Sequence, residues 1–283
     1  MKKLIIIYML WVGLIFPSIA QTFEAHSNLV KISMKPEEDM AMREELSKSG
    51  KYYALLIGVQ NYDDPEINDL GFPLEDVNDM ENILSSYYTF EKENIETLRD
   101  PTREQMIIAL DKLNKKLTEK DNLLIFYAGH GYYREDSKQG FWLPSNAQKE
   151  NSSKWFRNTT LVDYIRAIPS RHTLLISDAC FSGSIFRTRQ AFNNVSMAYY
   201  TMLKTPSRKA MTSGALQKVP DESVFLRYLK KKLLENENKY TSSEEFFASF
   251  KIAVMNNTST IPRFGEIQNA GDEGGDFIFI RKD

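Results

Sequence analysis

The chain has 283 residues, of which 42% are hydrophobic and 26% charged, and these ordinary proportions exclude a disordered, collagen-like or coiled-coil protein. A single cysteine excludes an intrachain disulfide framework and a thiolate zinc cluster, and three histidines argue against a multi-histidine metal site. The net charge of -2, without a long basic run, argues against nucleic acid as the main partner, because phosphate binding needs a concentrated positive face.

The first twenty residues have the pattern of a secretory signal peptide. Lys2 and Lys3 precede an apolar run over residues 4–16, and small residues stand at Ser18 and Ala20. The alternative is a membrane anchor, but 13 apolar residues reach only about 20 Å as a helix, short of the roughly 30 Å hydrocarbon core. We expect cleavage after Ala20 and an exported protein, periplasmic or extracellular, with no membrane attachment after cleavage.

A polar lead-in segment, residues 21–50, precedes a single domain that covers residues 51–283. Three unbroken apolar runs in this domain have the length of buried strands, namely 53–59, 123–128 and 173–177. Apolar residues recur at helical spacing over 74–87, 106–117, 161–168, 224–234 and 246–254. We predict shorter strands over 95–98, 141–143 and 277–280, and a loop over 181–206. Apolar strands that alternate with amphipathic helices predict an α/β fold, with a mostly parallel β-sheet flanked by helices on both faces.

Two of the predicted strands run into residues that can carry chemistry. The first is followed by His130, and the second by Cys180, the only cysteine of the chain. Because the carboxyl ends of parallel strands meet at one edge of a sheet, we expect these two side chains to be neighbours. His172 begins its strand and should lie at the opposite edge. Each residue also has a structural reading, since a cysteine is often simply buried and a lone histidine often belongs to the core.

A thiol beside an imidazole has the chemistry of a nucleophile. Part of the thiol is already thiolate near neutral pH, and a neighbouring histidine raises that fraction and later donates a proton. Acyl transfer also needs donors for the developing oxyanion. We expect the backbone N–H of Gly131 to be one donor and that of Cys180 to be the second.

The segments YAGHG and DACFSG, which contain His130 and Cys180, resemble those of caspase-like cysteine peptidases, in particular the bacterial, metacaspase-type branch. The ALLIGVQNY opening and the GGDFIFI ending support this resemblance, which runs from about residue 51 to the C-terminus. It implies a caspase-hemoglobinase fold, a three-layer αβα arrangement. It also implies that Cys180 is the nucleophile of a cysteine endopeptidase and that His130 is its acid/base.

The same resemblance implies a substrate preference. It places Asp178 and Asp76 in the S1 pocket, where two converging carboxylates attract a guanidinium or ammonium group. We therefore expect cleavage of protein or peptide substrates after Arg or Lys. The alternatives are a helix-dipole role for Asp76 and a loop-capping role for Asp178. Ala128 stands where the branch often has a polar residue, so it adds nothing to the pocket.

Many members of that branch need calcium, which prefers six to eight oxygen ligands with several carboxylates. Residues 158–162 lack the acidic pair that the branch has there, and only Glu135, Asp136 and Asp163 lie nearby in sequence. We expect no metal cofactor and no calcium requirement.

The basic residues that follow Cys180 suggest self-cleavage. We expect self-processing in a loop that extends over 181–209, with Arg187 and Arg189 as the candidate cleavage points and Lys204, Arg208 and Lys209 as its further basic residues. A mobile loop within reach of a basic-specific site would be an activation switch. The alternative is a solvated loop.

Two rival functions remain open. A cysteine phosphatase also has its nucleophile at a strand end, but the six residues between Cys180 and Arg187 make the loop one residue too long for its phosphate cradle. The stronger rival is a catalytically silent, caspase-like adaptor that binds a partner. The presence of both His130 and Cys180 counts against an adaptor, which needs neither.

Overall fold

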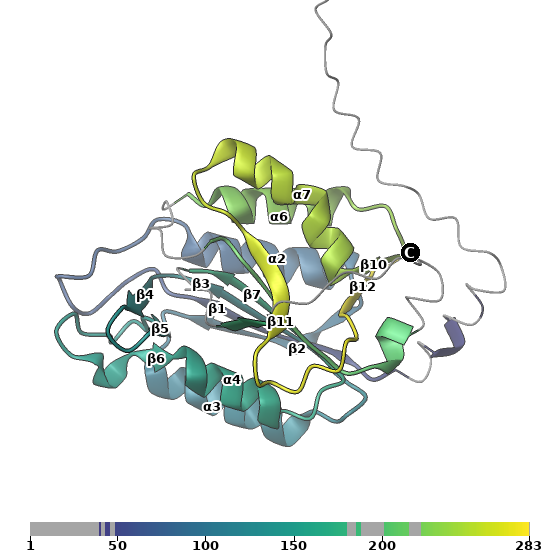
Figure 1. Cartoon of the computed structure of the whole chain (residues 1–283), viewed down its shortest axis with the longest axis horizontal. Coiled ribbons are helices and arrows are strands. Elements are labelled where there is room, and N and C mark those ends of the chain that lie inside the picture. The colour runs from purple at the N-terminus through teal and green to yellow at the C-terminus, as the bar shows by residue number, and fades with distance from the viewer. Residues whose placement is uncertain are drawn as a thin grey trace, which may run out of the picture. The chain divides into compact units, whose positions relative to one another are not determined.

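Seven strands form the central sheet of the computed structural model, in the order β2-β1-β3-β7-β9-β11-β8 (Figure 1). Their bounds are β1 Tyr52–Gly58, β2 Phe90–Arg99, β3 Asn122–Ala128, β7 His172–Asp178, β8 Phe186–Arg187, β9 Ser207–Thr212 and β11 Arg263–Ile267. β2, β1, β3, β7 and β9 are parallel, whereas β11 is antiparallel to β9 and to β8. The predicted mostly parallel sheet is confirmed, with an antiparallel border that the sequence did not indicate.

The structure describes residues 40, 43–45, 49–179, 185–187, 201–214 and 222–282. All of them belong to one compact unit, Lys31–Asp283. The signal peptide expected over residues 1–20 lies outside the described residues.

Helices cover both faces of the sheet, as the amphipathic patterns predict (Figure 1). On one face lie α2 Pro73–Tyr87, α6 Val224–Glu235 and α7 Ser243–Asn257, and on the other lie α3 Arg103–Lys116 and α4 Asn158–Ala167. Two apolar cores result, one for each face. On β7, Leu174 and Ile176 belong to the core under α2 and α6, and Leu175 and Ala179 to the core over α3 and α4. Since residues alternate along a strand, Asp178 points toward the α2 and α6 face.

The three middle parallel strands end together. Gly58, Ala128 and Asp178, the last residues of β1, β3 and β7, stand side by side in register. We call this end of the sheet the carboxyl edge. The opposite end, where Tyr52, Asn122 and His172 stand side by side, is the amino edge.

Two small sheets and a short helix lie outside the central sheet. One sheet contains β4 Gly131–Arg134, β5 Gln139–Trp142 and β6 Phe156–Arg157, the other contains β10 Tyr240–Ser242 and β12 Ile278–Ile280, and η1 covers Ser152–Lys154. The strand predicted over 277–280 therefore exists, but it pairs with β10. Because β4 starts at Gly131, the sheet of β4, β5 and β6 begins directly after the candidate histidine, His130.

The described part of the lead-in segment is attached at the amino edge. Glu45 forms ion pairs with Arg171 and Lys204, at 3.9 and 3.5 Å. The N–H of Gly50 donates to the carbonyl of Lys120 at 2.8 Å. These contacts hold Glu45 and Gly50 at the end of the sheet opposite to the strand ends that carry the candidate site.

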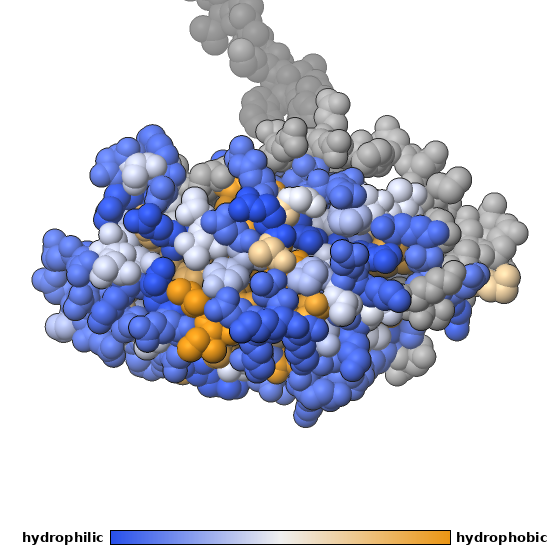
Figure 2. Space-filling model, turned by 90° about the horizontal axis from the view of Figure 1, so that it is seen from below, coloured by the Kyte–Doolittle hydropathy of each residue, from blue (hydrophilic) through white to orange (hydrophobic). Residues whose placement is uncertain are grey.

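The surface that Figure 2 shows is mostly hydrophilic, with apolar groups gathered toward its middle. Isolated apolar side chains such as Ile108 and Ile252 are exposed on helices, which is ordinary for a protein surface. Within the described ranges, no helix is long and apolar enough to cross a membrane.

Candidate active site

The two strand ends that the sequence singled out are neighbours in the sheet. Ala128 of β3 is paired in register with Asp178 of β7. His130 and Cys180 each follow two residues after these partners. Cys180 itself lies outside the described residues, but the residue before it, Ala179, is buried at the carboxyl edge. The two chain segments therefore reach the same edge.

His130 is held by contacts on both its ring and its backbone. Its Nε2 lies 2.8 Å from the carbonyl oxygen of Asn68. Since a carbonyl oxygen only accepts hydrogen bonds, this contact assigns a proton to Nε2 and leaves Nδ1 as the basic nitrogen of the neutral ring. The imidazole is therefore oriented for proton exchange at Nδ1.

Two buried tyrosines fix the backbone of His130. The N–H of His130 donates to the hydroxyl of Tyr62 at 2.9 Å, and the hydroxyl of Tyr127 donates to the carbonyl of His130 at 2.8 Å. The ring of Tyr127 stacks on Trp142, with centroids 4.1 Å apart. Burial raises the pKa of both phenols, so they remain protonated donors at neutral pH. This arrangement prevents the histidine from shifting along the edge.

The N–H of Gly131 takes no part in the pairing of β4 with β5. The N–H of Leu143 donates to the carbonyl of His130 at 3.0 Å. Antiparallel partners alternate between bonded and non-bonded pairs, so the next pair, Gly131 with Trp142, is a non-bonded one. The N–H of Gly131 is therefore directed away from β5.

Asp178 is a buried carboxylate at the end of β7. Burial raises its pKa to about 7, the hydroxyl of Ser223 opposes the rise, and the charge of Asp76 adds to it. Among the described residues its Oδ1 has no hydrogen-bond partner, and neither has the hydroxyl oxygen of Ser213. Unsatisfied buried acceptors are costly, so this carboxylate is suited to receive a donor from outside the domain.

Asp76 is brought to the same edge by a close contact between α2 and β1. A Cβ atom at Gly58 would lie 2.7 Å from the carbonyl oxygen of Pro73, so only glycine allows α2 to begin directly against the end of β1. Asp76 lies in the first turn of α2 and is 7% exposed. It is near enough to Asp178 for its charge to act on that group.

The carboxylate of Asp76 already has a partner. The ammonium of Lys230, on α6, donates to Asp76 at 2.8 Å and to Asp79 at 2.7 Å. Burial raises the pKa of Asp76, and the Lys230 contact opposes that rise. The two acids named from the sequence are thus electrostatically coupled, but only Asp76 is paired with a cation among the described residues.

The basic residues proposed as self-cleavage points are distributed differently from the prediction. Lys204 lies in a helical turn over 201–204, and Arg208 and Lys209 lie in β9 rather than in a loop. The guanidinium of Arg208 is buried against backbone carbonyls. The extension of the loop to residue 209 was therefore wrong, because residues 207–212 pair with β7. Arg187 lies in β8, and Arg189 lies outside the described residues.

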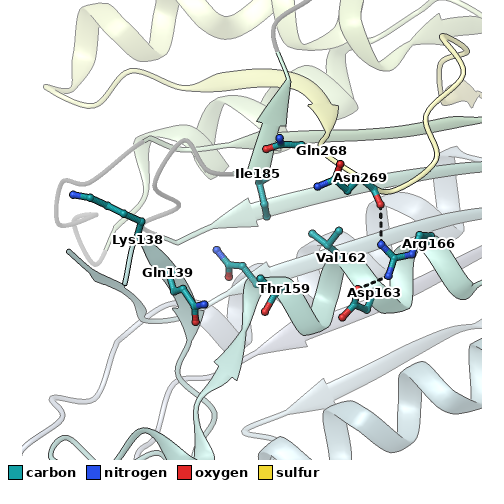
Figure 3. A pocket seen from close by; sticks show the side chains of 11 residues that line it. Lys138, Gln139, Thr159, Val162, Asp163, Arg166, Ile185, Gln268 and Asn269 are labelled. Carbon is teal, nitrogen blue, oxygen red and sulfur yellow. Dashed lines mark hydrogen bonds and ion pairs between the residues drawn. The ribbon is translucent and has the colours of Figure 1, made fainter. Parts of the chain in front are cut away.

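A separate pocket of about 200 Å³ lies between α4 and the segment that precedes β8 (Figure 3). Asn158 and Thr159, from the stretch considered for calcium, line it together with Ile185. Arg166 closes one side by contacts to Asp163 and to the carbonyl of Asn269, at 2.5 and 3.1 Å. Within the part of the chain that the structure covers, no three His, Cys, Asp or Glu side chains converge to hold a metal ion.

Sequence reasoning missed most of the groups that support the site. Asn68, Tyr62 and Tyr127 fix His130, and Lys230 pairs with Asp76. Tyr62 stands in the ALLIGVQNY segment and Tyr127 in YAGHG, so the two motifs did contain them. No local pattern indicates Lys230, which is 154 residues from its partner.

Comparison with known proteins agrees with the motifs. A family model described as the caspase domain matches residues 51–264. Metacaspase-1 of Pyricularia oryzae is 33% identical over 96 residues, which are 31% of this chain and 24% of that protein. Metacaspase-1 of Debaryomyces hansenii is 32% identical over 96 residues, 31% of this chain and 21% of that protein. The matched region thus spans about a quarter of the length of these relatives.

Solved structures resemble the fold. Caspase-1 from Spodoptera frugiperda superposes with a TM-score of 0.55 at 11% identity, over 78% of this chain and 92% of that one. A protein from Geobacter sulfurreducens superposes with a TM-score of 0.54 at 19% identity, over 81% of this chain and 100% of that one. These similarities confirm the caspase-like architecture that the motifs predict. Since the family model covers most of the sequence, the chain belongs to the caspase-domain family, and over 96 residues it is similar to metacaspases.

Proposed function

We propose that the protein is a cysteine endopeptidase in which Cys180 is the nucleophile and His130 the acid/base. The observation that carries this proposal is the register of β3 and β7, which ends both strands at one edge just before these two residues. The contact between Nε2 of His130 and the Asn68 carbonyl supports it, because this contact leaves Nδ1 for proton exchange.

The proposed reaction has two halves. Nδ1 of His130 accepts the thiol proton of Cys180, and the sulfur attacks the carbonyl carbon of the peptide bond. The N–H groups of Gly131 and Cys180 bind the resulting oxyanion. As the C–N bond breaks, His130 returns the proton to the leaving amine, and a thioester remains. Water, deprotonated by His130, then cleaves the thioester to a carboxylic acid and restores the thiol.

The proposed preference for Arg or Lys before the cleaved bond rests on Asp178. Its unpartnered Oδ1 and the hydroxyl of Ser213 lie on the α2 and α6 side of the sheet end. A guanidinium or ammonium group supplies only donors and carries the opposite charge. A basic side chain of a protein or peptide substrate would thus satisfy acceptors that the described residues leave unsatisfied.

A thiol-reactive peptidyl-arginine probe tests the activity directly. We expect stoichiometric labelling of the wild-type protein at Cys180, loss of labelling in Cys180→Ala, and weaker labelling with a peptidyl-citrulline probe of equal size. Citrulline keeps the shape of arginine and removes its charge. Absence of labelling in a folded protein would instead favour a catalytically silent adaptor.

The proposal includes activity without calcium. Residues 158–162 lack carboxylates, so this stretch offers few of the ligands that calcium prefers. We expect an Arg peptide to be cleaved equally well in chelator and in added calcium. Loss of activity in chelator, restored by added calcium, would contradict the proposed independence of calcium. It would leave the proposed peptidase activity intact.

Export and self-processing complete the proposal. We propose that the protein is exported and that the exported chain begins at Gln21, which mass spectrometry of protein from the culture medium or periplasm would test.

We also propose self-cleavage after Arg187 or Arg189. The wild type would then give two bands on a denaturing gel, whereas Cys180→Ala would remain one band.

A further inference from the structure

Helix α6 bears groups that act on both acids of the proposed pocket. Ser223 caps its N-terminus and acts on Asp178, and Lys230, seven residues later, pairs with Asp76. Residues seven apart lie on the same side of a helix. A single face of α6 thus supplies a hydroxyl to one acid and a positive charge to the other.

The Lys230 contact is partly shielded from water. The side chains of Lys230 and Asp76 are 20% and 10% exposed, whereas that of Asp79 is 43% exposed. An ion pair is worth more when it is withdrawn from water, and a buried carboxylate that loses its partner is left at a cost. The pair with Asp76 is therefore the important one, and Asp79 is a solvated second contact.

The two acids differ in what they can offer a substrate. Asp76 uses one carboxylate oxygen for Lys230, whereas Asp178 pairs with no basic side chain in the described ranges. A cation that enters the pocket therefore meets one available carboxylate and one that is already neutralised.

We propose that Lys230 is a specificity-determining residue, a resident cation that occupies Asp76 so that Asp178 alone receives the positive charge of the substrate. This inference rests on the proposed function. Lys230 moderates the preference for basic residues, because a pocket with two available carboxylates would bind a guanidinium more tightly. It acts on the substrate through Asp76 and takes no part in bond cleavage.

The test compares Lys230→Met with the wild type at pH 8, above the pKa of about 7 that burial gives Asp178. The measured quantity is the ratio of kcat/KM for an Arg peptide to that for the citrulline peptide of the same sequence. We expect this ratio to rise about tenfold in Lys230→Met, which corresponds to about 1.4 kcal/mol. Lys230→Arg, which keeps the charge, should retain the wild-type ratio.

Two further variants show whether the effect passes through Asp76. Asp79→Asn removes the solvated partner of Lys230 and leaves its contact with Asp76, so its ratio should equal that of the wild type. In the double variant Lys230→Met/Asp76→Asn the gain should disappear, because the released carboxylate is gone. An unchanged ratio in Lys230→Met, or a gain that persists in the double variant, would overturn the inference.

Binding without catalysis separates this inference from the proposed function. Agmatine, a small guanidinium compound, can be titrated into Cys180→Ala and Cys180→Ala/Lys230→Met by calorimetry. We expect about tenfold tighter binding to the second protein. If affinity increases but no peptide is cleaved by the wild type, the peptidase proposal fails and the role of Lys230 stands. If peptides are cleaved but neither ratio nor affinity changes in a folded Lys230→Met protein, the reverse holds.

Discussion

His130 and His172 stand at opposite ends of two neighbouring strands, and they differ in burial and in the partners of their ring nitrogens. His172 is 1% exposed, and both ring nitrogens have partners, the hydroxyl of Ser207 and the carbonyl of Leu203. Burial lowers its pKa to about 3, so it stays neutral. His130 is half-buried and uses one ring nitrogen for the Asn68 carbonyl. The histidine at the amino edge is thus a buried, fully hydrogen-bonded part of the core, whereas the histidine at the carboxyl edge keeps one ring nitrogen for proton exchange.

The difference extends to the charged residues of the two edges. At the amino edge, the guanidinium of Arg208 donates to the carbonyls of Ile165, Ser170, Arg171 and Ser207. At the carboxyl edge, Asp178 is buried with an unsatisfied oxygen. The amino edge therefore stabilises the fold, whereas the carboxyl edge keeps polar groups available at the expense of stability.

Replacing the histidine of the carboxyl edge should have the largest effect. We expect His130→Ala to lower kcat for an Arg peptide about 1,000-fold, since general acid–base catalysis contributes 10²–10⁴. Its melting temperature should stay near that of the wild type, because among the described residues the half-buried ring has only two contacts to lose, with the Asn68 carbonyl and the Tyr62 ring. Steady-state kinetics and thermal unfolding of the same preparation check both. Full activity in His130→Ala would show that the histidine of the carboxyl edge is not needed for the reaction.

The corresponding change at the amino edge should act on stability. We expect His172→Ala to lower the free energy of unfolding by about 3 kcal/mol, because it leaves a cavity and removes the partners of Ser207 and Leu203. Denaturant titration measures this loss. The folded fraction, counted with the peptidyl-arginine probe, should turn over substrate at the wild-type rate. A loss of kcat without a loss of stability would mean that the two edges are not separate in function.

Removing the charge of Asp178 should change selectivity. We expect Asp178→Asn to lower kcat/KM for the Arg peptide about 30-fold, since hydrogen bonds to charged groups contribute about 1.5–3 kcal/mol. The citrulline peptide should be affected less than threefold. An equal loss on both peptides would indicate that Asp178 supports the loop rather than the substrate.

The pH dependence should carry the signature of the same acid. Burial raises the pKa of Asp178 to about 7, and only the ionised form attracts a cation. The Arg to citrulline ratio of kcat/KM should therefore rise with pH, about tenfold between pH 6 and pH 8. An effect of pH that both peptides share cancels in the ratio. A flat ratio would show that Asp178 is already ionised at pH 6.

The smallest effect is expected for the loss of the Tyr127 hydroxyl, which holds the backbone of His130. Tyr127→Phe removes the hydroxyl that donates to the His130 carbonyl and keeps the ring on Trp142. We expect a loss of about 1 kcal/mol in unfolding free energy and a severalfold lower kcat, because the histidine is less firmly positioned. Phe126→Leu, on the other face of the same strand, is the control, and it should lower stability without lowering kcat of the folded protein.

The local patterns of the sequence predicted the strand that precedes His130 and the strand that ends at Asp178. Buried strands appear as short apolar runs, and amphipathic helices as apolar residues at helical spacing. These patterns failed where the deciding partner is distant. β11 is short and half polar, and only its pairing with β9 makes it a strand. Lys230 reads as one of several charged residues on α6, and only the approach of α6 to α2 makes it the partner of Asp76. Cys180 was found from its motif, and its side chain lies outside the described residues.

The pairing of β8 with β11 bears on whether the two fragments of a self-cleaved chain stay together. Ile185 is buried, its carbonyl accepts from the N–H of Gln268, and Phe186 pairs with Ile267. A break after Arg189 would place β8 and β7 on one fragment and β9 and β11 on the other, so that two strand pairings would join the fragments. The nicked protein would therefore elute from a sizing column as a single species of unaltered mass, and only denaturant would separate its halves.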